Sequence, residues 1–156
     1  QALIKLGLLP GGHIETLTAD HPTLTYNTIG RHLSRMVNTK VISTKSPWMC
    51  DAKAGEIYTV PISHGEGRFI ASPQQVLEFN KTGQIATQYV DFDGIASMDS
   101  RFNPNQSVAA IEGIYSPDGR VFGKMAHSER CGTGISKNIY GQLEMPIFTS
   151  GVKYFK

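Results

Sequence analysis

Alternating hydrophobic and polar residues mark two stretches of the chain, a pattern that is typical of strands with one buried face. The alternation is partial over residues 31–42 and more regular over residues 56–63. In the second stretch, the apolar side chains that share one face are Tyr58, Val60 and Ile62. Pro61 cannot donate a hydrogen bond to a neighbouring strand, so this strand is predicted to lie at a sheet edge or to end there. Residues 84–92 are predicted to form a further strand.

A helix is predicted to begin at Ser72. Ser72 suits the N-cap, Pro73 the first helical position, and Gln75 completes a capping box. Gly83 is predicted to end the helix. The residues expected to be buried on it are Val76, Leu77 and Phe79.

A shorter helix is predicted at the start of the chain, with one apolar face and a stop at residues 10–12, which read Pro-Gly-Gly. The residues of that face are Ala2, Leu3, Leu6 and Leu9. No Ser, Thr, Asp or Asn precedes this helix to cap it. The chain also begins at Gln1 without an initiator Met, so we expect it to be a processed protein or a piece of a longer one.

Residues 111–115 and 120–125 are predicted to pair as a β-hairpin. The connecting residues 116–119 read Ser-Pro-Asp-Gly, in which proline sets the turn entry and glycine tolerates a positive φ. Beyond Arg130 the chain is rich in Gly, Ser and Thr, with weak periodicity. The pattern as a whole predicts one mixed α/β domain with more strand than helix.

Composition excludes several classes of protein. The 156 residues include 15 Lys and Arg against 13 Asp and Glu, which gives a net charge of +2 and no broad basic face for nucleic acid. The longest apolar runs, such as residues 108–111, are too short to span a membrane, and no signal peptide is apparent. Cys50 and Cys131 are expected to be reduced thiols. We therefore expect a cytoplasmic protein that binds neither nucleic acid nor membrane.

Two His-x-Glu sequences concentrate the candidate chemistry. His64 and Glu66 follow a predicted strand beside two glycines, and His127 and Glu129 follow the hairpin. In extended backbone, residues i and i+2 project to the same side. A carboxylate beside an imidazole fixes the ring tautomer and leaves the other nitrogen free as a base for a Ser or Cys nucleophile.

Two other interpretations of these residues stay open. Each pair could be a surface ion pair at the end of a strand, or the four side chains could together bind zinc or iron. No nucleophile is evident for either pair. Cys50 has no strand-turn-helix elbow around it, and Cys131 is close to Glu129 in sequence, so both are expected to be structural or incidental.

The segments around these histidines resemble the glutaminase domain of phosphoribosylformylglycinamidine synthase. The resemblance rests on SHGEGRF at residues 63–69 and GRVFGKMAHSER at residues 119–130. Gln106 stands where that family usually has glycine. The resemblance covers nearly the whole chain. Further matching segments are residues 1–12, 103–107 and 110–114.

The resemblance implies the class I glutamine amidotransferase fold, an α/β sandwich with a mostly parallel sheet. We therefore expect residues 1–156 to form a partial fold of this class, a mixed sheet flanked by helices with an added β-hairpin. Gln1 is similar to the glutamine that closes the family's Cys-Asn-Gly-x-Gln elbow. The chain would then be the C-terminal part of the domain, with the nucleophilic cysteine upstream and no activity by itself.

The resemblance also implies roles for individual residues. His127 would be the general base and acid, and Glu129 would orient it. Gln1 would lie near the glutamine substrate because of its elbow position, and His64 would shape a turn rather than act as a second base. The turn expected to receive the amino-acid end of the substrate consists of Ser63, His64, Gly65 and Glu66.

The implied activity is release of ammonia from glutamine for a synthetase domain of the same enzyme. That domain would use ATP and magnesium to convert formylglycinamide ribonucleotide to formylglycinamidine ribonucleotide in de novo purine biosynthesis, and this part would need no cofactor of its own. The alternative is a noncatalytic scaffold domain with a glutaminase fold.

Overall fold

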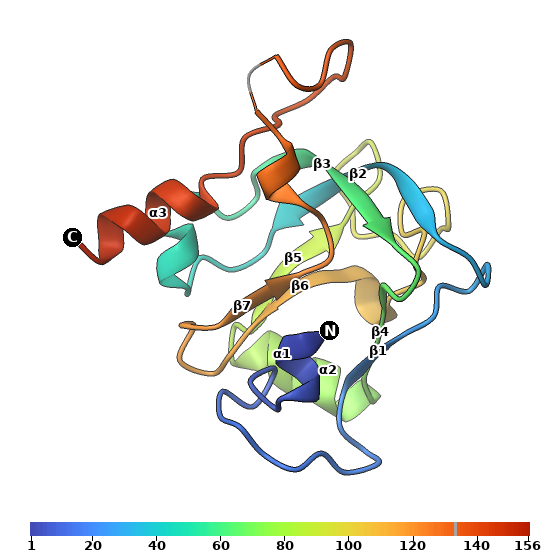
Figure 1. The fold of residues 1–156 in the computed structure, drawn as a ribbon, viewed down its shortest axis with the longest axis vertical. Coiled ribbons are helices and arrows are strands. Elements are labelled where there is room, and N and C mark those ends of the chain that lie inside the picture. The colour runs from blue at the N-terminus through green and yellow to red at the C-terminus, as the bar shows by residue number, and fades with distance from the viewer. Residues whose placement is uncertain (133) are drawn as a thin grey trace.

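A five-stranded sheet forms the centre of the molecule, in the order β3-β2-β5-β6-β7 (Figure 1). The computed structural model describes residues 1–132 and 134–156. The strands of this sheet are β2 (Leu33–Val41), β3 (Ile57–His64), β5 (Ile85–Tyr89), β6 (Ile111–Tyr115) and β7 (Phe122–Lys124). A separate two-stranded ladder pairs β1 (Thr23–Thr25) with β4 (Arg68–Ile70). The strands at residues 31–42, 56–63 and 84–92 and the hairpin are thus confirmed, with shifts of a few residues at their ends.

All the strand pairs in residues 1–132 and 134–156 are antiparallel. We expected a mixed sheet, with parallel as well as antiparallel pairs. The described residues form antiparallel pairs only. For β6 and β7 the physical reason is the tight turn that joins them, since parallel neighbours need a crossover of a dozen or more residues. The helices and the added hairpin of the expected fold are present.

The edge position of β3 follows from its sequence. Pro61 pairs with Met36 of β2, and in the described sheet β3 has no neighbour on its other side. A residue without an N–H is tolerated at such an edge. The predicted inner face of β3, Tyr58, Val60 and Ile62, is fully buried.

Helix α2 (Pro73–Lys81) begins as predicted. Ser72 accepts a hydrogen bond from the Gln75 backbone amide, and the Gln75 side chain accepts one from the Ser72 amide, which completes the capping box. Its buried face is narrower than predicted. Phe79 is buried and Val76 partly so, but Leu77 is 61% exposed because it points away from the sheet.

The N-terminal helix α1 (Ala2–Lys5) is shorter than predicted, and of the predicted apolar face Leu9 is buried and Leu3 partly so, whereas Ala2 is exposed. It ends before Gly7, whose φ of 79° reverses the chain, so residues 10–12 do not terminate it. Ile4 and Leu9 enter the core, whereas Leu6 is 46% exposed. The expected absence of a side-chain cap at its start is confirmed, since Gln1 makes no such bond.

Helix α3 (Ile147–Tyr154) lies in the Gly-, Ser- and Thr-rich tail, where no helix was predicted. It packs against η1 (Pro47–Met49), and the two elements lie side by side in Figure 1. A Cβ at Gly151 would lie 2.5 Å from the Trp48 ring, so only glycine permits this contact. The helix thus depends on a distant partner, which local periodicity does not reveal.

Two hydrophobic clusters hold these elements together. One joins β2, β3 and β5 to Met49 of η1 and Ile147 of α3. The other joins Phe79 of α2 and Ile4 of α1 to β5 and β6. None of the helices in residues 1–132 and 134–156 has the length and apolar character that a membrane crossing requires.

Candidate active site

His127 and Glu129 form a direct pair, in which the His127 Nδ1 lies 2.6 Å from the Glu129 Oε1. The i, i+2 spacing predicted a pair in extended backbone, but the two residues do not lie in a strand. His127 follows β7 and is the N-cap of η3 (Ser128–Arg130), a short turn that folds Glu129 back toward the imidazole. The predicted pairing is therefore present, by a different local geometry.

The surroundings of Glu129 keep it ionised. Partial burial opposes its charge, but a hydrogen bond from its own backbone amide and the bond to His127 outweigh that effect and lower the pKa of the carboxyl. An ionised acceptor at Nδ1 holds the proton on that nitrogen and leaves Nε2 unprotonated in the neutral ring. The pair can therefore accept or donate a proton at Nε2.

An open hollow of about 550 Å³ lies in front of this pair. Its lining includes Gln1, all four residues of the turn 63–66, and His127. The Gln1 side-chain amide donates a hydrogen bond to the Glu66 carboxylate, which links the first residue to the turn. The residues that the sequence singled out for binding therefore line one hollow together with His127. Glu129 is hydrogen-bonded to His127.

The turn that follows β3 is fixed by Asn27, a residue that the sequence analysis did not identify. The buried Asn27 side chain donates to the His64 carbonyl at 2.8 Å and accepts from the Gly67 amide at 3.1 Å. Its backbone amide also donates to the Gly65 carbonyl at 2.9 Å. Nothing in the local sequence marks Asn27, because its partners are about 40 residues away in the chain.

The His64 side chain points back into the turn rather than across the hollow. A Cβ at Gly67 would lie 2.1 Å from the His64 Nε2, so the ring occupies the space that only a glycine leaves open. Burial lowers the pKa of His64, and the nearby Asn105 side chain partly opposes this shift. A neutral ring packed on the turn agrees with the shaping role expected for His64.

Spacing alone does not identify the catalytic pair. A third His-x-Glu sequence, His13 and Glu15, also forms an ion pair, at 3.2 Å. Both residues of this third pair are absent from the lining of the hollow. What distinguishes His127 is its position beside Gln1 and the turn 63–66.

The metal-site interpretation finds no support in the geometry. Among residues 1–132 and 134–156, no group of three or more His, Cys, Asp or Glu side chains is arranged to hold a metal ion. His64 and Glu66 therefore do not join His127 and Glu129 as one set of ligands.

Both cysteines are free thiols, and neither lines the hollow. Cys50 is exposed next to α3, where its thiol lies 3.5 Å from the Ser150 carbonyl. Cys131 packs against the core, and burial raises its pKa, which disfavours the reactive thiolate. The geometry thus agrees with the expectation that neither is the nucleophile.

Comparison with known proteins identifies the relatives of this chain. The family model of the CobB/CobQ-like glutamine amidotransferase domain matches residues 1–155. Phosphoribosylformylglycinamidine synthase subunit PurQ of Treponema denticola is 41% identical over 145 residues, and that of Thermomicrobium roseum is 34% identical over 130 residues. Each alignment covers 83% of this chain, and 52% and 50% of the respective relatives.

A solved structure has the same fold. The structure of PurLQS from Thermotoga maritima matches with a TM-score of 0.69 and 26% sequence identity, over 100% of this chain and 58% of that one. The likeness agrees with the α/β fold expected for residues 1–156. The chain spans about half the length of the curated relatives it matches.

Proposed function

The chain belongs to the CobB/CobQ-like glutamine amidotransferase domain family, and on that premise we propose that it forms part of the glutaminase of a phosphoribosylformylglycinamidine synthase. The relatives named above support this function, since they carry that enzyme's name. The observation that carries the proposal is the His127–Glu129 pair at 2.6 Å beside the hollow lined by Gln1 and residues 63–66. The pair supplies a proton-transfer group and the hollow supplies space for a small amide.

In this proposal His127 moves the protons of the reaction. The nucleophile is a cysteine thiolate of the parent protein, which attacks the side-chain amide carbon of glutamine and forms a thioester. His127 first takes the proton of the cysteine thiol at Nε2 and gives it to the leaving nitrogen, which departs as ammonia. It then takes a proton from the water that hydrolyses the thioester and returns it to the departing thiolate. Ionised Glu129 keeps the Nδ1 proton in place and stabilises the imidazolium when it forms.

The turn 63–66 binds the amino-acid end of glutamine. Its backbone is held rigidly by Asn27 and lines the hollow opposite His127. Rigid placement matters because a reacting group displaced by about 1 Å can cost on the order of 100-fold in rate. Gln1, which bonds to Glu66, borders the same space.

The released ammonia passes to a synthetase domain, where ATP and magnesium serve the conversion of formylglycinamide ribonucleotide. We assign that chemistry and the binding of ATP to the partner, in the cytoplasm, and none of it to this chain. The match to a structure of PurLQS supports an assembly with further parts of the synthase. A noncatalytic scaffold with the same fold is less favoured, because it would not need the His127–Glu129 pair in the hollow.

Glutamate release from glutamine by the parent protein tests this function. His127→Ala should lower the rate by about 100-fold or more, the usual size of a general acid–base contribution. The matched control is His13→Ala, which removes a histidine that also pairs with a glutamate but lies outside the hollow. Equal rates for both variants and the unchanged protein would contradict the assignment.

A further inference from the structure

A buried carboxylate lies directly behind the candidate catalytic histidine. Glu112, in the middle of β6, has no solvent exposure. Its Oε1 accepts hydrogen bonds from the backbone amides of Met125 at 3.0 Å and Ala126 at 2.7 Å, and its Oε2 accepts one from the Thr87 hydroxyl at 2.5 Å. The two amides belong to the residues that immediately precede His127.

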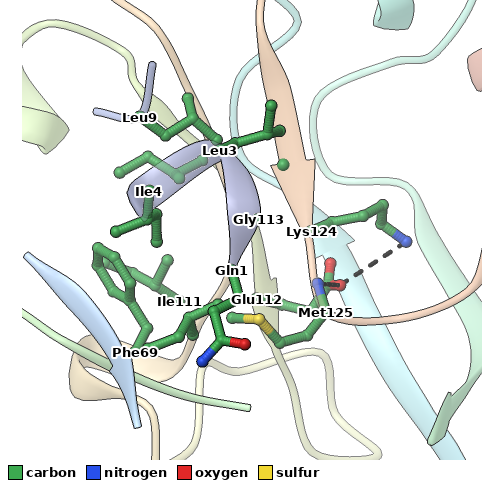
Figure 2. A pocket seen from close by; sticks show the side chains of 13 residues that line it. Gln1, Leu3, Ile4, Leu9, Phe69, Ile111, Glu112, Gly113, Lys124 and Met125 are labelled. Atoms are coloured by element: carbon green, nitrogen blue, oxygen red, sulfur yellow. Dashed lines mark hydrogen bonds and ion pairs between the residues drawn. The ribbon is translucent and has the colours of Figure 1, made fainter. Parts of the chain in front are cut away.

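Lys124 is the counter-ion of this carboxylate. Its ammonium lies 3.7 Å from the Glu112 Oε1, and its side chain is only 11% exposed. Figure 2 shows the Lys124 side chain directed toward Glu112, beside the apolar residues of a cavity of about 90 Å³ under α1. The same ammonium donates to the Ser128 hydroxyl at 3.0 Å. Lys124 therefore joins Glu112 to the residue that follows His127.

The chain around His127 is thus bonded at four successive residues. Glu112 holds residues 125 and 126, and Lys124 holds residue 128. The His127 amide itself donates to the carbonyl of Pro61 at 2.8 Å. One ion pair thus supplies bonds on both sides of His127, to two backbone amides before it and to the Ser128 hydroxyl after it.

A buried ion pair is a poor way to stabilise a core, because removing two charges from water offsets most of their attraction. An apolar pair of similar volume would fill the same space. Such an apolar pair could not accept hydrogen bonds from two backbone amides before His127, and it could not donate one to the hydroxyl of the residue after it. The arrangement therefore points to positioning rather than to stability.

We propose that Glu112 and Lys124 are positioning residues for the catalytic histidine of the glutaminase reaction. The inference rests on the proposed function and extends it to Glu112, which lies outside the hollow, and to Lys124, a mostly buried residue of its lining. Neither acts on glutamine chemically; they hold the backbone of residues 125–128 so that the His127–Glu129 pair meets the substrate in one geometry. Their loss should therefore lower kcat for glutamine hydrolysis and leave the KM for glutamine nearly unchanged.

The test uses the parent protein with four variants and glutamine hydrolysis as the readout. Glu112→Ala removes the acceptors, Glu112→Gln keeps one oxygen for the two amides, and Lys124→Met keeps the length of the side chain without its charge. Lys153→Met is the matched control, because Lys153 of α3 forms an exposed ion pair with Asp51 and neither residue lines the hollow. Amide hydrogen exchange at residues 125 and 126 is followed in each protein.

The inference is supported if Lys124→Met lowers kcat by about tenfold or more, with KM within twofold and Lys153→Met unchanged. Glu112→Gln should retain more of kcat and of the amide protection than Glu112→Ala does. If Glu112→Ala does not fold, Glu112→Gln and Lys124→Met decide the matter. The inference is overturned if both of these keep kcat within twofold while His127→Ala is inactive. Absence of glutamine hydrolysis by the unchanged protein would instead contradict the proposed function.

Discussion

The Nδ1 of His127 lies 2.6 Å from the Oε1 of Glu129, and a three-residue turn rather than a strand brings them together. The contact has the length of a charge-assisted hydrogen bond. It leaves Nε2 without this partner, and His127 lines the hollow together with Gln1 and residues 63–66. The catalytic proposal depends on this one relationship.

Replacement of Glu129 by glutamine should separate charge from shape. Glu129→Gln keeps the size of the side chain but offers no negative charge to the imidazolium, and its amide can hold the wrong tautomer. We expect glutamine hydrolysis to fall by about 100-fold or more, since loss of the orienting carboxylate in such a triad costs up to about 10⁴-fold. Steady-state glutamate release measures the effect, with Glu15→Gln in the third His-x-Glu pair as the control.

The same contact predicts a pH dependence. The pKa of Glu129 is lowered in the folded protein, so its interaction with His127 stabilises the fold above the unfolded pKa of about 4.5 and is lost as the pH falls through the lower folded value. Titration of the Glu129 carboxyl by NMR should give a pKa below its ordinary value. In His127→Ala that pKa should rise, and an unchanged value would show that His127 does not contribute.

The Asn27 side chain should matter for binding more than for proton transfer. Asn27→Ala removes bonds to the His64 carbonyl and the Gly67 amide and leaves these groups buried without them. A loss of about 1–3 kcal/mol in the free energy of unfolding is expected from such groups. Because the turn 63–66 shifts, the KM for glutamine should rise while His127 stays in place. Denaturant unfolding and steady-state kinetics measure the two effects, and an unchanged KM would argue against substrate binding by the turn.

Two neighbouring glycines offer a matched pair of variants. At Gly67 an added Cβ would lie 2.1 Å from the His64 Nε2, whereas at Gly65 no heavy atom lies within 4 Å. Gly67→Ala should therefore displace the His64 ring and destabilise the protein by about 1–3 kcal/mol, as overpacking usually does. Gly65→Ala should unfold at nearly the same denaturant concentration as the unchanged protein. Equal midpoints for the two variants would contradict the placement of the His64 ring.

Much of the fold could be predicted from the sequence because the relevant signals are local. Alternation placed β3, and the Ser72–Gln75 capping box placed the start of α2. Helix α3 escaped prediction because it is short and its contact with Trp48 depends on Gly151. The burial of Leu77 was wrong for a related reason, since the width of a helix's buried face is set by what packs against it.

For the candidate site, the sequence indicated the chemistry better than the geometry. The His-x-Glu spacing at His127 predicted a pair, but the turn that forms it depends on the hydrogen bond between His127 and Pro61. Asn27 and Glu112 could not be predicted, because their partners become neighbours only after the strands have paired.

The most direct test of the central claim compares two nitrogen sources in the assembled synthase to which the proposal assigns this chain. Formation of formylglycinamidine ribonucleotide is measured with glutamine and, separately, with ammonia, for the unchanged protein and for His127→Ala. If His127 serves only the release of ammonia, the variant loses glutamine-dependent synthesis by about 100-fold or more and keeps ammonia-dependent synthesis. Retention of glutamine-dependent synthesis, or equal loss of both activities, would contradict the account.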